Sequence, residues 1–188
     1  MTLVNDPMEA FRATRPAFVK VWDPFVRLFH FSLLLFFAVA WITADELERL
    51  HEIAGYAIAI LVGLRIVWGL IGTRHARFSD FLYRPSTFAG YVKDSIRMRA
   101  KRYLGHNPAG GVMILALLVS LSVATGTGIM SIMDAFWEVE WVEELHEGAS
   151  NLTLGLVFLH VVGVFVASFQ HRENLVGSLF TGRKRRDD

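Results

Sequence analysis

Four long apolar stretches dominate the hydrophobic pattern of this 188-residue chain. Each is close to the roughly 20 residues that a helix needs to cross a hydrocarbon core of about 30 Å. Because lipid offers no hydrogen-bond partners, a chain that crosses it must satisfy its backbone internally, as a helix does. The pattern therefore predicts an all-α membrane protein, a bundle of four transmembrane helices at about 25–43, 50–72, 109–133 and 145–169.

Composition narrows the class of protein further. With 53% hydrophobic residues and a mean hydropathy of +0.39, the chain is too apolar for an ordinary soluble domain. A net charge of +1 and 13% aromatic residues exclude intrinsic disorder. The absence of cysteine excludes disulfides, iron–sulfur ligation and covalent attachment of a c-type haem. A redox cofactor would need other ligands.

The positions of the basic residues predict the topology. Of the 19 Lys and Arg residues, all but Arg49 and Arg65 lie before Phe31, within 73–108 or after Gln170. The positive-inside rule then places both termini and the 73–108 connection in the cytoplasm, and the two other loops outside. Most of the acidic residues lie in those outer loops, around 44–52 and 134–147.

The basic runs at 97–102 and 183–186 follow from this topology and from attraction to anionic lipid. We therefore expect membrane lipid as a partner and no nucleic acid. Residues 88–104 mix aromatic and basic positions, which fits either an interfacial helix or a plain loop.

We divide the chain into a polar N-terminal leader, residues 1–20, and one four-helix domain, residues 21–186. A signal peptide cleaved after Ala40 is not expected, because Trp41 continues the apolar span and cleavage would discard His30.

Four histidines lie within or at the ends of the spans, where ionisable side chains are costly and indicate function. His146 and His160 are fourteen residues apart, so they share a helix face and differ in depth by about 21 Å. His51 opens the second span level with His146, whereas His30 lies deeper, level with His160. We therefore expect an outer pair, His51 with His146, and an inner pair, His30 with His160.

Two stacked histidine pairs are what two bis-imidazole b-type haems require. Structural zinc wants four ligands together, and a proton relay would favour carboxylates at intermediate depth, which the spans lack. The remaining histidines, His75, His106 and His171, are expected to be solvated or to contact headgroups, with no ligand role.

Two arginines are candidate partners of haem propionates. Arg65 lies fourteen residues after His51 and so faces the same interior at the deeper level, although snorkelling to the surface is the alternative. Arg27, three residues before His30, is either a propionate partner or a headgroup contact. Glycines near the histidines would either admit a macrocycle or allow close helix packing: Gly55, Gly126, Gly128 and Gly163.

Several motifs together resemble the bacterial cytochrome b561 family, which is related to the membrane cytochrome b subunit of nickel–iron hydrogenases. The resemblance covers residues 21–186. Its motifs are V-W-D-P-F-V-R-L-F-H at 21–30, L-H-E-I-A-G-Y at 50–56, R-I-V-W-G at 65–69, H-N-P-A-G-G at 106–111, E-L-H-E-G-A-S-N and L-V-F-L-H within 144–160, and H-R-E-N-L-V at 171–176.

The resemblance implies two non-covalent haem b groups, with axial ligands at the positions of His30, His51, His146 and His160. It also implies a bacterial inner-membrane protein that moves electrons between the quinone pool and a second redox partner. Some related proteins oxidise superoxide while reducing ubiquinone, and others anchor larger dehydrogenases.

We therefore expect transmembrane electron transfer, as an electron carrier or a quinone-linked oxidoreductase. The acidic outer loops favour a basic partner, such as a periplasmic cytochrome, over anionic superoxide. The alternatives are a haem-bearing anchor subunit of a dehydrogenase or hydrogenase, and a non-haem transporter or proton channel that uses histidines. Four tryptophans are expected to be interfacial anchors: Trp22, Trp68, Trp137 and Trp141.

Overall fold

The computed structural model describes residues 17–186 and is mostly helical. Four of its helices are long and apolar enough to cross a membrane, which confirms the predicted fold class. The elements in chain order are β1 (Phe18–Lys20), α2 (Pro24–Thr43), α3 (Glu48–Ile71), the 3-10 turn η1 (Arg74–Ala76), α4 (Phe78–Phe81), α5 (Pro85–Ile96), α6 (Pro108–Ser131), the 3-10 turn η2 (Asp134–Phe136), α7 (Glu140–Gln170), α8 (Leu175–Thr181) and β2 (Arg183–Arg185).

Helix starts follow local capping rules. Asp23 and Asn107 precede prolines at the first positions of α2 and α6, and their side chains accept hydrogen bonds from Val26 N at 2.9 Å and Gly110 N at 2.7 Å. The fourth long helix, α7, begins at Glu140, five residues before the span predicted from about 145. Its first turn carries Glu140 and Glu143, which stabilise a helix N-terminus.

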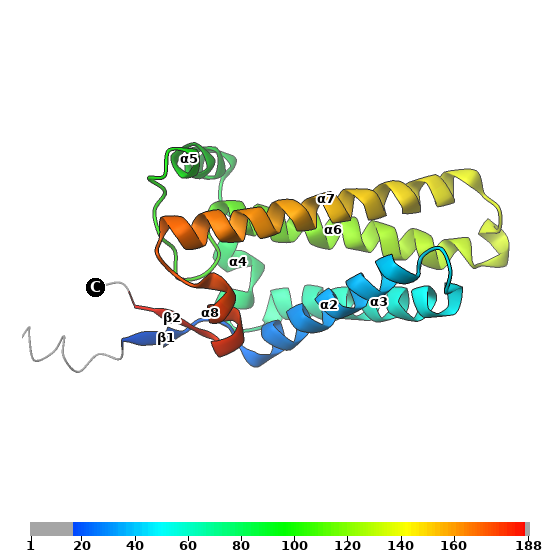
Figure 1. Ribbon diagram of the computed structural model, residues 1–188, viewed down its shortest axis with the longest axis horizontal. Coiled ribbons are helices and arrows are strands. Elements are labelled where there is room, and N and C mark those ends of the chain that lie inside the picture. The colour runs from blue at the N-terminus through cyan, green and yellow to red at the C-terminus, as the bar shows by residue number, and fades with distance from the viewer. Residues whose placement is uncertain (1–16, 187–188) are drawn as a thin grey trace, which may run out of the picture.

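The long helices form two antiparallel hairpins, α2 with α3 and α6 with α7 (Figure 1). The hairpins meet where α3 packs against α6, around the buried residues Ile58, Val62, Leu118 and Leu121. Within the described chain, neither α2 nor α3 packs closely against α7. The bundle is therefore joined along one seam, and α7 rests on α6.

Both ends of the described chain lie at the same end of the bundle (Figure 1). There β1 pairs with β2 in an antiparallel ribbon in which Val19 is opposite Lys184. The helix α5 lies at this end as well. Residues 88–104, for which the sequence left a helix or a loop open, are therefore helical as far as Ile96. We call it the inner end, after the topology expected from the charge pattern. Residues 1–16, most of the expected leader, lie outside the described residues.

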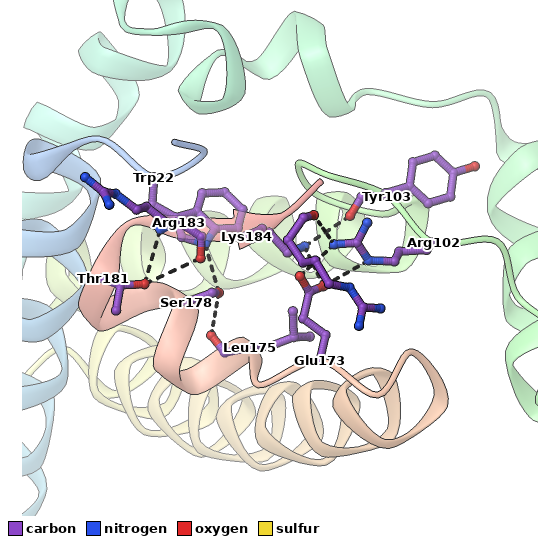
Figure 2. Close-up of polar contacts among 10 residues, drawn as sticks. Trp22, Arg102, Tyr103, Glu173, Leu175, Ser178, Thr181, Arg183 and Lys184 are labelled. Atoms are coloured by element: carbon purple, nitrogen blue, oxygen red, sulfur yellow. Dashed lines mark hydrogen bonds and ion pairs between the residues drawn. The ribbon is translucent and has the colours of Figure 1, made fainter. Parts of the chain in front are cut away.

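A buried ion cluster fastens the inner end (Figure 2). Both carboxylate oxygens of Glu173 bind Arg102, at 2.7 and 3.2 Å, and Lys184 Nζ lies 3.5 Å from Glu173. Lys184 Nζ also donates to the carbonyl of Tyr103 at 3.0 Å. The side chains of Glu173 and Lys184 are 8% and 5% exposed, so β2 is held to the end of α7 by charges shielded from water.

We expect Glu173→Gln to lower the free energy of unfolding by about 3 kcal/mol, because it leaves the buried ammonium of Lys184 without its anion. Thermal unfolding in detergent, followed by circular dichroism, measures the change. Glu143→Gln, which alters an exposed carboxylate in the first turn of α7, is the control and should unfold at the native temperature.

The same cluster predicts a pH dependence. Burial raises the pKa of Glu173, but the hydrogen bond from Arg102 and the charge of Lys184 more than offset it, so the pKa lies below the ordinary 4.5. The stabilisation is therefore complete above about pH 4.5 and is lost as the pH falls through the lowered pKa. An equally steep acid loss of stability in Glu173→Gln would contradict this role.

Candidate functional site

The outer pair of histidines joins the start of α3 to the start of α7. The ring centroids of His51 and His146 are 6.1 Å apart, and the ring planes are 81° apart. His51 Nδ1 lies 2.9 Å from the carbonyl oxygen of Ala40, and His146 Nδ1 lies 2.8 Å from that of Ala124. Since a carbonyl only accepts, each Nδ1 carries the proton and each Nε2 keeps a free lone pair.

The inner pair joins α2 to α7. The ring centroids of His30 and His160 are 6.3 Å apart, with 47° between the ring planes. Nδ1 of His30 is buried and has no hydrogen-bond partner among residues 17–186. The structure thus brings together the two pairs expected from helix depth. Carbonyl oxygens hold both rings of the outer pair at Nδ1, whereas His30 of the inner pair has no such hydrogen bond among the described residues.

Both separations suit a metal ion between the rings. An imidazole nitrogen binds a first-row metal at about 2 Å, and the corners of a five-membered ring lie about 1.1 Å from its centre, given sides of about 1.35 Å. Two imidazoles on opposite sides of one ion therefore have centroids roughly 6 Å apart. In the described chain no third His, Cys, Asp or Glu joins either pair to make a three-ligand group. The donor set fits a metal whose other ligands come from a flat macrocycle, as in haem.

The glycines that lie near the histidines in the sequence differ in their surroundings. A Cβ atom added at Gly55, Gly126 or Gly163 would meet no described atom within 4 Å, so close helix packing does not account for these glycines. Gly128 is different, because a Cβ there would lie 2.9 Å from His146 Cε1. Its missing side chain makes room for the imidazole ring itself.

The two candidate arginines have different surroundings. Arg65 is 3% exposed, so it does not snorkel to the surface. Arg27 Nε donates to the carbonyl of Leu179 at 2.8 Å, and Arg27 Nη2 donates to that of Phe180. These are carbonyls near the end of α8, which cations stabilise. Contact of either arginine with a cofactor remains a prediction, and the geometry favours Arg65.

Some polar groups at the inner end do not follow the sequence expectation. His106, expected to be solvated, lies between the rings of Trp22 and Phe81, with centroids 4.7 and 4.8 Å away. Trp22 and Trp68, expected as interfacial anchors, donate to Ser178 and Asp23. Hydropathy gave no sign of this cluster, because its members come from separate connections.

His75 also has a protein contact. His75 Nδ1 lies 2.9 Å from Asp80 Oδ2, so it is bound rather than solvated. On the outer side, Trp137 and Trp141 are 65% and 54% exposed, as interfacial anchors would be.

Four apolar helices that carry paired imidazoles at two depths are typical of integral membrane cytochromes of the b type. Residues 21–182 match the family model of prokaryotic cytochrome b561, and the chain belongs to this family. The resemblance seen in the sequence motifs is thereby confirmed. Comparison with curated proteins and with solved structures gives no match.

Membership in this family identifies the chain as a multi-pass bacterial membrane protein that takes part in transmembrane electron transfer through b-type haem.

Proposed function

We propose that the protein transfers electrons across the bacterial inner membrane, between the quinone pool and a second redox partner, with one haem b at each histidine pair. The supporting observation is the separation of 6.1 and 6.3 Å between facing imidazole rings. Haem supplies one-electron redox chemistry when it is bound. The chain supplies the ligands, their orientation and the exclusion of water.

The residues divide this task between two depths. His51 and His146 keep Nε2 available as a ligand, because the carbonyls of Ala40 and Ala124 accept from Nδ1 of each ring. His30 and His160 lie about 21 Å deeper, the rise of the fourteen residues between His146 and His160. The two levels thus cover most of a hydrocarbon core of about 30 Å. A histidine on each side would fill both axial positions, which favours electron transfer over oxygen binding.

The partner on the outer side is proposed to be a basic redox protein, such as a periplasmic cytochrome. Acidic side chains around the starts of α3 and α7 would attract it electrostatically: Asp45, Glu46, Glu48, Glu140, Glu143 and Glu144. The same charges would repel superoxide, so coupling of superoxide oxidation to ubiquinone reduction is the less favoured form of the proposal.

We expect the protein purified in detergent to contain two haem b groups per chain, measured by pyridine haemochrome assay against protein concentration. In liposomes, the chemically reduced protein should be reoxidised by added ubiquinone, followed by loss of the reduced α band. Vesicles without ubiquinone are the control.

Other outcomes would favour the alternatives. A colourless preparation without Soret or α bands would contradict the proposal and favour a histidine-based transporter or proton channel. Two haems without reoxidation by quinone, together with co-purification of a large peripheral subunit, would favour an anchor subunit of a dehydrogenase or hydrogenase.

A further inference from the structure

Arg65 carries a buried charge that no ion pair in the described chain neutralises. Its side chain is almost fully buried in α3, and Nη1 has no hydrogen-bond partner among the described residues. The guanidinium lies over the ring of Phe78, with Cζ 5.5 Å from the ring centroid. A buried cation without a contacting anion is unfavourable, which points to an acceptor from outside the chain.

The carboxylate of Asp23, whose charge acts on Arg65, already has other hydrogen-bond partners. Asp23 Oδ1 accepts from Val26 N at 2.9 Å, and Asp23 Oδ2 accepts from Trp68 Nε1 at 3.2 Å and from the hydroxyl of Thr73. Asp23 attracts Arg65 from a distance but makes no ion pair with it in the part of the chain described here. Its oxygens serve the start of α2 and the end of α3 instead.

A second unpartnered nitrogen lies close to this charge. Nδ1 of His106 is buried and has no hydrogen-bond partner among residues 17–186. Burial, followed by the nearby charge of Arg65, lowers the pKa of His106 to about 3, so the ring is neutral at physiological pH. The neutral ring carries one N–H and can donate it to an acceptor without adding a second buried charge.

The short helix α4 brings the two groups together. Phe78 lies under Arg65, Phe81 contacts His106, and the centroids of the two phenylalanine rings are 5.8 Å apart. Two unpartnered nitrogens, one charged and one neutral, thus lie close to the same aromatic pair, near enough for the charge of Arg65 to act on His106. A carboxylate suits such a set, because it accepts several hydrogen bonds and neutralises one charge.

Depth indicates where the carboxylate comes from. Arg65 is six residues from the inner end of α3, and His30 is six residues from the inner end of the antiparallel α2. Both therefore lie about 9 Å from that end, at the level of the inner histidine pair. A lipid phosphate would need a surface opening, whereas Arg65 is nearly inaccessible to solvent.

We propose that Arg65 and His106 together bind one propionate carboxylate of the haem held by His30 and His160. This inference depends on the proposed function. The two residues would fix the rotation of the macrocycle within its plane and stabilise the propionate charge. Removing a donor from that carboxylate should favour the oxidised haem, because uncompensated negative charge nearby disfavours the addition of an electron.

The test uses the full-length protein loaded with haem that is ¹³C-labelled at the propionate carboxyls. Reduced-minus-oxidised infrared difference spectra report the labelled carboxylate band, and a potentiometric titration reports the two reduction equilibria. In His106→Leu we expect the labelled band to shift and one equilibrium to fall about tenfold, which is 59 mV for one electron. His106→Gln, which keeps an N–H donor, should restore both values in part.

His171→Leu is the control, because His171 follows α7 at the same end of the bundle and is not among the groups whose charge acts on His106. It should leave the band and both equilibria unchanged. An unshifted band in His106→Leu with both haems bound would overturn the inference and leave the proposed function intact. Movement of lipid phosphate bands alone would also overturn it. A protein that takes up no haem would instead contradict the proposed function.

Discussion

Replacing His146 with alanine is expected to reduce the haem content by about half, through loss of the outer haem alone. The His146 ring is fixed by its hydrogen bond to Ala124 and faces His51 across 6.1 Å. Without it, His51 loses the imidazole that lies opposite it on α7. The inner pair lies about 21 Å deeper and shares only α7 with the outer pair, so it should keep its cofactor.

Haem-to-protein ratio and the reduced-minus-oxidised spectrum measure this loss, and circular dichroism checks that the helices remain. His171→Ala is the control, because His171 follows the same helix but belongs to neither pair. Its haem content should equal that of the native chain. Loss of both haems from His146→Ala with intact helices would contradict the independence of the two pairs.

The second large effect is expected from a single methyl group at Gly128. A Cβ atom there would lie 2.9 Å from Cε1 and 3.0 Å from Nδ1 of His146, closer than side chains normally approach. Because Gly128 is one turn beyond Ala124 on α6, the imidazole lies across this turn while it donates to the Ala124 carbonyl. Gly128→Ala should displace the ring from that carbonyl and weaken binding of the outer haem by about 10- to 100-fold.

Gly126→Ala is the matched control, since it adds the same methyl group two residues away, where nothing lies within 4 Å. Affinities come from titrating the haem-free protein with haem and following the Soret band. Equal affinities in the two variants would show that the ring tolerates the added methyl group and that Gly128 does not position it. Weaker binding in both variants would indicate a general effect on α6.

Helical arithmetic accounts for what the sequence predicts well. A fixed rise and rotation per residue convert the positions of His51 and His146, and of His30 and His160, into matching depths. These are the rings that the structure places 6.1 and 6.3 Å apart. Hydropathy likewise finds the four spans, because the bilayer imposes their length.

The inner end is less predictable, because its contacts join distant parts of the chain. Nothing local in residues 18–20 indicates pairing with 183–185. The burial of His106 depends on Trp22 and Phe81, which come from separate connections. Arg27 shows the same difficulty, since its partners are carbonyls more than 150 residues later, near the end of α8. Patterns along the sequence report periodicity and do not indicate such contacts between distant segments.

The single seam between the hairpins has a consequence for biogenesis. Among the long helices of the described chain, α3 against α6 is the close contact between the two hairpins, and the imidazole pairs join α2 and α3 to α7. If the histidine pairs hold haem as proposed, iron ligation would complete the assembly of hairpins that are inserted one after the other. Cells short of haem would accumulate an inserted but loosely joined precursor, exposed to membrane proteases, so cofactor supply would set the abundance of the mature protein.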